Sequence, residues 1–289
     1  MSDLSHKTNR LRVATISFLN PAPLLWNFEH APVAAALRTR YDVHYTLPSL
    51  CAAQLASGEA DLGLIPIAAL PGLPEVRAVP GCTIASLHAV RSIQLVLRPG
   101  VTLATLRTVA ADTASRSSAA YVRILLQQFH DNRPAFQQQP ADLRTMLQTS
   151  DAALLIGDPA LLALEERDRT GQFVDCTWID VATWWRQHTG LPWVAAVWAV
   201  RTKALQRCGI PAQALTADLV ASRDGGLQHR EDLVAEWFPR LALPKQTIRT
   251  YLSENIHYTL DADCLQAMQR FYELGSACGV LREYHLHML

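Results

Sequence analysis

Hydroxyl side chains gather in one short segment, Thr113 to Ser118, beside a predicted helix at residues 118–129. The first N–H groups of a helix have no partner within it, and the helix dipole places partial positive charge at the same end. Together with side-chain donors, such an end binds anions. One serine would be enough to cap the helix. The longer run therefore predicts a binding site for an anionic ligand, made by Thr113, Ser115, Arg116, Ser117 and Ser118.

Two strand ends elsewhere in the sequence also carry polar residues. Ser17 and Asn20 follow the apolar segment 11–16, and Gly157 and Asp158 follow the apolar segment 152–156. Ligands of open α/β sheets bind beyond the carboxyl ends of the strands, so we expect these four residues at one cleft. A purely structural interpretation stays open for two of them. Asn20 and Asp158 each stand directly before a proline, as the N-cap of a helix often does.

The segment from Ser86 to Ser92 is the remaining candidate. It precedes an apolar strand predicted at residues 92–97 and offers the hydroxyls of Ser86 and Ser92. Taken alone, it is typical of a loop that leads into a strand. His88, within it, is more typical of a loop residue than of a catalytic base.

Signatures of several common chemistries are absent from the sequence. It has no GxGxxG, P-loop, HExxH or GxSxG motif, which disfavours hydride transfer, phosphoryl transfer and metal-dependent hydrolysis. The pair His285 and His287 is more typical of a solvated chain end than of a metal site. The six cysteines are scattered without a CxxC pair and are expected to be small buried residues. We therefore expect no metal site.

The overall charge excludes another group of functions. Lysine plus arginine and aspartate plus glutamate both total 26, so the net charge is zero. A nucleic-acid or membrane surface would need clustered cations, so we expect neither partner. The polar start of the sequence has no signal-peptide core, and no apolar run reaches the length of a membrane span. These features predict a cytoplasmic protein that binds a small molecule.

Apolar segments alternate with helical patterns along the chain, as in parallel βαβ units. Strands are predicted at 11–16, 41–47, 60–66, 92–97, 108–111, 152–156 and 193–201. Strand-like crossings near residues 95–98 and 196–201 divide them into two series. The predicted fold is therefore α/β with two lobes: residues 1–96 and 199–289 form the first lobe, and residues 97–198 form the second. The ligand cleft lies between them, and the chain is expected to be helical from Pro244 to its end.

Several motifs, taken in order, resemble those of the chorismate dehydratase family. They are Ile16-Ser17-Phe18-Leu19-Asn20, Val90-Arg91-Ser92, Ser115-Arg116-Ser117-Ser118, Leu154-Leu155-Ile156-Gly157-Asp158, Thr189-Gly190-Leu191-Pro192 and Asn255-Ile256-His257-Tyr258-Thr259-Leu260. No single motif is specific. Their order over nearly the whole chain carries the resemblance.

The resemblance implies a fold like that of type II periplasmic binding proteins. It also implies cofactor-free dehydration of chorismate to 3-[(1-carboxyvinyl)oxy]benzoate in the futalosine route to menaquinone. Under this hypothesis Asn20 and Ser86 are catalytic. The substrate-binding residues are Ser17, Ser92, Thr113, Ser115, Arg116, Ser117, Ser118, Gly157 and Asp158.

The chain departs from the family pattern in one place, where His88-Ala89 replaces a frequent Gly-Pro. This weakens the transfer of a role to residues around His88, whereas Ser86 still aligns. Two other functions remain open. One is a cytosolic binding or sensor protein of the same fold without catalysis, because a fold does not determine a function. The other is the sister enzyme that makes dihydroxynaphthoate, whose first loop looks different.

Overall fold

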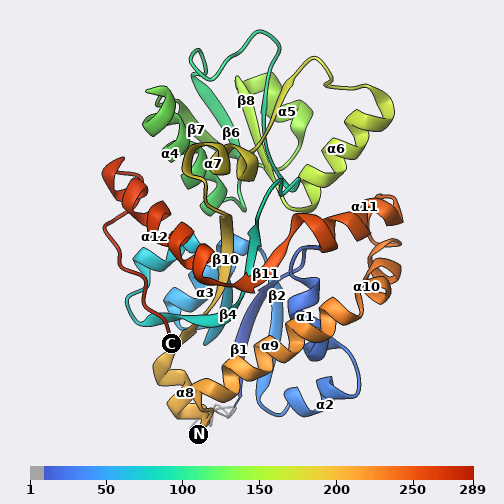
Figure 1. The fold of residues 1–289 in the computed structure, drawn as a ribbon, viewed down its shortest axis with the longest axis vertical. Helices are drawn as coiled ribbons and strands as arrows, with labels where there is room; N and C mark the ends of the chain where they lie inside the picture. The colour runs from blue at the N-terminus through green and yellow to red at the C-terminus, as the bar shows by residue number, and fades with distance from the viewer. Residues whose placement is uncertain (1–9) are drawn as a thin grey trace, which may run out of the picture.

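The computed structural model describes residues 10–289, which form two β-sheets with helices packed around them (Figure 1). Residues 1–9, which the sequence assigns to the first lobe, lie outside the described residues. The first sheet has the strand order β11-β4-β10-β3-β1-β2. Its strands are β1 (Leu11–Ile16), β2 (Tyr41–Thr46), β3 (Leu62–Pro66), β4 (Val76–Ser86), β10 (Trp193–Arg201) and β11 (His257–Leu260).

The second sheet has five strands in the order β7-β6-β8-β5-β9. They are β5 (Ile93–Leu97), β6 (Thr108–Asp112), β7 (Ala135–Gln139), β8 (Ala152–Ile156) and β9 (Thr177–Asp180). Both sheets are mixed. In the first, β1 runs parallel to β2 and β3 while β10 is antiparallel to its neighbours. In the second, β6 runs parallel to β7 and β8 while β5 is antiparallel to β8 and β9.

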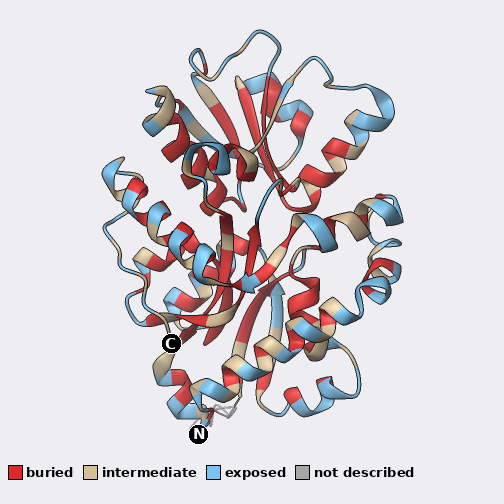
Figure 2. Cartoon of the chain, viewed as in Figure 1, coloured by how far each residue is buried: buried red, intermediate tan, exposed pale blue. Residues whose placement is uncertain are grey.

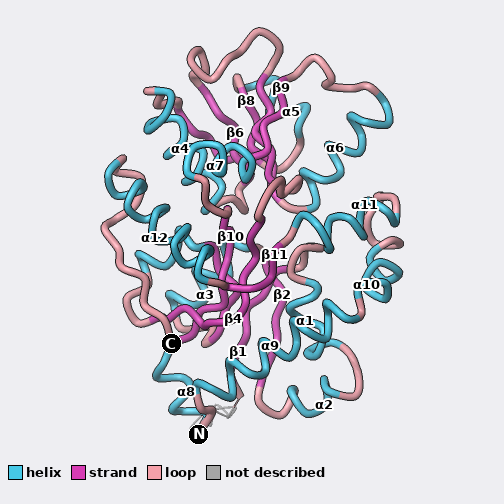
Figure 3. Tube along the Cα trace, in the orientation of Figure 1, coloured by secondary structure: helices cyan, strands magenta, loops and turns pink. Residues whose placement is uncertain are grey.

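The chain passes between the sheets twice, and Figure 3 shows both passages as loops. It leaves the first sheet after Ser86 and enters the second at Ile93, then returns between Thr189 and Trp193. The boundaries expected at 96/97 and 198/199 fall inside β5 and β10. Each of these strands belongs as a whole to one sheet. The chain therefore passes from one sheet to the other several residues before the expected boundaries.

Helices cover both sheets. Those around the first sheet are α1 (Ala22–Glu29), α2 (Val33–Leu37), α3 (Pro48–Ser57), α8 (Thr202–Cys208), α9 (Ala212–Gln228), α10 (Arg230–Trp237), α11 (Lys245–Thr250) and α12 (Ala262–Ala277), with a 3₁₀ turn η1 (Ile67–Gly72) and a π-helical turn η2 (Tyr251–Asn255). Those around the second are α4 (Ser117–His130), α5 (Leu143–Thr149), α6 (Asp158–Thr170) and α7 (Val181–Thr189).

Local sequence explains several helix ends. Asp142, Asp180 and Asp261 are N-caps whose carboxylates accept the N–H of the third residue onward. Gly58 ends α3 in the left-handed conformation, which glycine adopts readily after the last turn of a helix. No helix among residues 10–289 combines the length and the hydrophobicity that crossing a bilayer requires.

The apolar core runs continuously from the first sheet into one face of the second (Figure 2). Tyr121 of α4 shows how they are joined. Its ring packs against Trp185 of α7 and Phe271 of α12, with centroids 4.8 and 4.3 Å apart. Its hydroxyl donates to the carbonyl of Val194 in β10 at 3.1 Å. A second, smaller apolar cluster covers the other face of the second sheet. The two sheets therefore share a packed side, formed by α4, α7, α12 and β10.

One expectation about the elements was wrong, and one long strand was missed. The C-terminal part is not helical throughout: β11 interrupts it, and residues 278–289 follow α12 without a further helix. The long strand β4 was not predicted, because Pro80 and Gly81 in its middle are typical of a turn.

Candidate active site

A narrow cavity of about 50 Å³ lies where the two sheets meet. Its polar lining residues are Asn20 from the first sheet's side and Arg116, Ser117 and Ser118 from the start of α4. The other lining residues are Ile16, Phe18, Pro48, Pro66, Ile84, Ile93, Ala114, Ile156, Gly157, Ala195 and Ala196. The loops after β1, β6 and β8 contribute lining residues, and β3 contributes its last residue, Pro66, so the cleft forms at the strand ends.

The start of α4 forms one wall of the cavity. Within the described chain, no hydrogen bond from the backbone N–H groups of Ser117 and Ser118 is found. The turn before the helix is held by buried Asp112, which accepts the N–H of Ala114 at 2.9 Å. Ser115 Oγ accepts the N–H of Ala119 at 3.2 Å. Ser115, which precedes the N-cap residue Arg116, thus holds the first turn of α4, while the N–H groups of Ser117 and Ser118 stay unbonded at the cavity wall, as an anion site requires.

Ser117 has a structural role as well. Its hydroxyl donates to the carbonyl of Ala195 in β10 at 3.0 Å and accepts the N–H of Ala68 in η1 at 3.2 Å. One side chain therefore ties the anion-receptive end of α4 to the first sheet. What Ser117 can still offer a ligand is its backbone N–H.

Asn20 faces α4 across the cavity. It was expected as a possible N-cap of a helix that begins at Pro21. However, α1 begins at Ala22, so Pro21 occupies the cap position. The N–H groups of Ala22 and Leu24 bond to the carbonyls of Leu19 and Pro21 in a turn that precedes the helix. Asn20 Oδ1 is buried and has no partner among residues 10–289. The amide therefore has hydrogen-bonding capacity left for a ligand, and toward a carboxylate its NH₂ group is the donor.

Ser86 ends β4 and is 1% exposed. Its Oγ has no hydrogen-bond partner among the residues that the structure describes. A buried hydroxyl without a partner costs free energy unless a ligand or water satisfies it. Ser86 does not line the cavity in this arrangement, but Ile84 of the same strand does.

Ser92 is buried in the passage between the sheets, and its hydrogen bonds hold this passage in place. Its Oγ accepts the hydroxyl of Tyr251 at 2.7 Å, and its carbonyl accepts the N–H of Gly157 at 2.7 Å. Asp180 fixes the same passage by accepting the N–H groups of Val90 at 3.2 Å and Arg91 at 2.7 Å. The bond from Tyr251 ties the passage to the first sheet's side, and the other three hold it to the ends of β8 and β9.

Gly157 allows the two sides of the cleft to touch. Its backbone has φ 63° and ψ −144°, a combination that is essentially restricted to glycine. A Cβ on this residue would lie 2.7 Å from the ring of Phe18, which belongs to the loop after β1. Glycine is thus required both by the conformation and by the close approach of Phe18.

Asp158 forms a further hydrogen bond across the cleft. The sequence allowed it to be a helix cap, but Gly157 holds the cap position and no side chain caps α6. Asp158 Oδ1 instead accepts the N–H of Leu19 at 3.0 Å. The carboxyl group is 8% exposed. Burial raises its pKa to about 6, although the bond from Leu19 acts in the opposite direction.

Five of the residues predicted for the site line the cavity: Asn20, Arg116, Ser117, Ser118 and Gly157. The remaining six, Ser17, Ser86, Ser92, Thr113, Ser115 and Asp158, are not among its lining residues. Ser17 and Thr113 are exposed. The apolar lining was not predicted as part of the site. Its one recognisable signal is the adjacent small pair Ala195 and Ala196 in a strand of mostly bulky residues.

The cavity lining offers little for a metal ion. Among the described lining residues there is no His, Cys, Asp or Glu, and the charged residue is Arg116. A cation would therefore find no side-chain ligand set here. The donors present suit an elongated anion with apolar parts.

Solved structures with the same fold include several binding proteins. A protein from Archaeoglobus fulgidus superposes with a TM-score of 0.72 at 14% identity, covering 96% of this chain and all of that one. The periplasmic aliphatic sulphonate binding protein SsuA from Escherichia coli gives 0.65 at 16% identity, covering 97% of this chain and 94% of that one. At such identities the likeness shows the fold alone, a two-lobed periplasmic-binding-protein fold.

Sequence comparison is more specific. A curated chorismate dehydratase from Thermus thermophilus is 29% identical over 254 residues, which cover 84% of this chain and 90% of that protein. The profile of a family described as menaquinone biosynthesis matches residues 11–277. This match includes both sheets, the cavity and every residue predicted for the site. The chain therefore belongs to the menaquinone-biosynthesis family.

Proposed function

We propose that this chain dehydrates chorismate to 3-[(1-carboxyvinyl)oxy]benzoate and water in the cytoplasm, without a cofactor. Family membership and the relative from Thermus thermophilus support the reaction. The observation that carries the proposal is the placement of Asn20 opposite the N–H groups of Ser117 and Ser118 in one cavity. This arrangement offers separate donors to the two carboxylates of the substrate.

Binding of the dianion rests on few charges. Arg116 is the charged residue of the lining, and the start of α4 supplies free N–H groups. A hydrogen bond to a charged group contributes about 1.5–3 kcal/mol. Because the cavity is narrow, chorismate needs its walls to separate. We propose that the lobes built on the two sheets part on the side of the Leu19–Asp158 contact, opposite the packed side formed by α4, α7, α12 and β10.

The chemistry that the site must support is an elimination. The ring proton beside the enolpyruvyl oxygen is vinylogous to the ring carboxylate, so the electron pair of the broken C–H bond can spread onto that carboxylate. The pair then forms the new ring double bond as hydroxide leaves the neighbouring carbon. Hydroxide combines with the removed proton to give water, and the ring becomes aromatic. Donors aimed at the carboxylate would stabilise the intermediate in the manner of an oxyanion hole.

The group that removes the ring proton is less obvious than the donors. Asp158 has a pKa of about 6, which suits a general base, but it accepts the Leu19 N–H and does not line the cavity. An amide such as Asn20 is far too weak a base. We therefore assign proton removal to the enolpyruvyl carboxylate of the substrate, which reaches the proton through a six-membered arrangement. Asn20 would orient that carboxylate.

Kinetics with two variants test this assignment, after folding and chorismate binding have been checked in each. Asn20→Ala should lose about 10²–10⁴-fold in turnover, the range in which a positioned base contributes. Asp158→Asn should keep most of its turnover, because the amide oxygen can still accept the Leu19 N–H. If Asp158→Asn loses about 10³-fold while binding chorismate normally, Asp158 is the base and the substrate is not. If the unmodified protein binds chorismate without turnover, the proposed function itself is wrong.

A further inference from the structure

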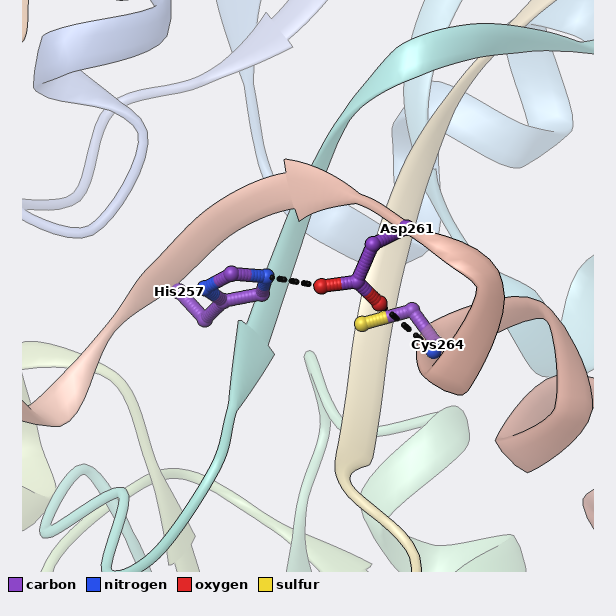
Figure 4. A group of neighbouring side chains, drawn as sticks. All are labelled: His257, Asp261 and Cys264. Atoms are coloured by element: carbon purple, nitrogen blue, oxygen red, sulfur yellow. Dashed lines mark hydrogen bonds and ion pairs between the residues drawn. The ribbon is translucent and has the colours of Figure 1, made fainter.

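Three metal-binding side chains converge away from the cavity, where β11 turns into α12. They are His257 on the strand, Asp261 at the helix cap and Cys264 in the first turn (Figure 4). Their donor atoms all lie within 4.8 Å of one another. None of the three lines the cavity.

Helix capping alone explains only part of this cluster. Asp261 Oδ1 accepts the N–H of Cys264 at 2.9 Å, which completes the cap. The second oxygen, Oδ2, is bonded to His257 Nε2 at 2.8 Å (Figure 4). Capping requires neither the imidazole nor a thiol at the third position. The cap bond also holds the carboxylate in a fixed orientation, as bonds around a metal ligand do.

We propose that His257, Asp261 and Cys264 bind a Zn²⁺ ion through Nε2, Oδ2 and Sγ. A nitrogen, an oxygen and a sulfur donor together are a set that zinc accepts, whereas calcium and magnesium require oxygen ligands. Three protein ligands leave one tetrahedral position for water. The ion replaces the thiol proton of Cys264 and the hydrogen bond between His257 and Asp261.

Binding requires side-chain movements that open one donor distance and bring the other donor atoms, now within 4.8 Å of one another, to the spacing that zinc needs. Tetrahedral zinc at bond lengths of about 2.0–2.3 Å separates its ligand atoms by about 3.3–3.6 Å. The His257 Nε2 to Asp261 Oδ2 distance of 2.8 Å must therefore open by about 0.5 Å. An ion can enter from solvent, because the side chains of His257 and Asp261 are 24% and 39% exposed, while Cys264 is fully buried behind them.

The position of these three residues in the fold predicts an effect of zinc on stability. His257 is paired with Ala85 in β4, directly before Ser86. An ion held here would connect β11, the start of α12 and, through the strand ladder, the strand that carries Ser86. Zinc should therefore stabilise the folded protein, because a ligand that binds only the native state shifts the unfolding equilibrium.

Cobalt provides the first test, since a thiolate bound to Co²⁺ gives a charge-transfer absorption. The protein is freed of metal and carries Cys176→Ser, Cys208→Ser and Cys278→Ser, which removes the partly exposed thiols. We expect one Co²⁺ per chain with this absorption, and its loss on adding Zn²⁺. Cys264→Ser should abolish the absorption. Cys82→Ser, a buried thiol on the adjacent strand, is the matched control and should keep it.

A second variant covers the case in which Cys264→Ser fails to fold. His257→Gln changes a partly exposed side chain and should weaken Zn²⁺ binding at least about 10-fold. Zinc should raise the melting temperature of the cysteine-reduced protein and raise it much less in His257→Gln. The proposal is overturned if the cysteine-reduced protein binds no stoichiometric Co²⁺ or Zn²⁺, or if the charge-transfer absorption survives Cys264→Ser. Either result would leave the cluster as a helix cap with a histidine partner.

Discussion

The contact between Asp158 and Leu19 predicts a pH-dependent stability. Asp158 is 8% exposed, and its pKa in the folded protein is about 6, against an ordinary value of 3.8. Because the folded-state pKa is the higher one, the folded protein binds the proton more tightly than the unfolded chain. This carboxyl group therefore favours folding most at low pH, and its ionisation makes folding less favourable as pH rises from about 4 to about 6.

Asp158→Asn removes the ionisation and keeps an oxygen that can accept the Leu19 N–H. From the two pKa values, ionised Asp158 costs about 1.6 kcal/mol at pH 5 and about 3 kcal/mol at pH 7.5. The advantage of the asparagine variant should therefore grow by about 1.4 kcal/mol between these pH values. Because the Asp158 carboxyl group is only 8% exposed, solvent screening reduces this free-energy difference very little.

Urea unfolding of both proteins at pH 5, 6, 7 and 7.5 measures this difference. The comparison cancels the titration of every other group that the two proteins share. A third protein, Asp158→Ala, separates charge from hydrogen bonding. It should be less stable than Asp158→Asn at every pH by about 1–3 kcal/mol, since the Leu19 N–H then has no partner. A stability difference between the wild-type protein and Asp158→Asn that does not change with pH would refute the reasoning.

Three further substitutions test other parts of the site. Ser86→Ala should weaken chorismate binding about 10- to 100-fold, the equivalent of 1.5–3 kcal/mol, without lowering the melting temperature, because the hydroxyl has no partner among the described residues. Ser115→Ala should instead lower the free energy of unfolding by about 1 kcal/mol through the lost bond to Ala119, as urea titration would show. Gly157→Ala should lower the free energy of unfolding by about 1–3 kcal/mol and raise KM, because its Cβ meets the ring of Phe18. Adding Phe18→Ala to this variant should bring KM part of the way back to the wild-type value.

Much of the fold could be predicted because hydrophobic periodicity is a local property. The strands at 11–16, 152–156 and 193–201 have the predicted bounds. Prediction failed where local signals conflict with the tertiary structure. Pro80 and Gly81 would end most strands, yet β4 continues through them with an irregular register against β10. The largely exposed edge strand β7 is polar and has no apolar alternation, so it was not among the predicted strands.

The site was predicted less well than the fold, for a related reason. Asn20 and Asp158 both match the pattern of a helix cap. Sequence alone does not locate the first residue of a helix to better than one position, so it does not distinguish the cap residue from its neighbour. Leu19 and Asp158 are 139 residues apart, so their contact depends on how the lobes approach each other. The apolar walls, among them Ile84 and Ala196, could not be distinguished from ordinary core residues.

The central claim is that this chain alone converts chorismate. The most direct measurement is incubation of the purified, chelator-treated protein with chorismate, followed by mass spectrometry and NMR of the products. We predict one product, 3-[(1-carboxyvinyl)oxy]benzoate, with the loss of one water and no need for an added metal or cofactor. Chorismate recovered unchanged in the presence of protein that binds it would contradict the claim.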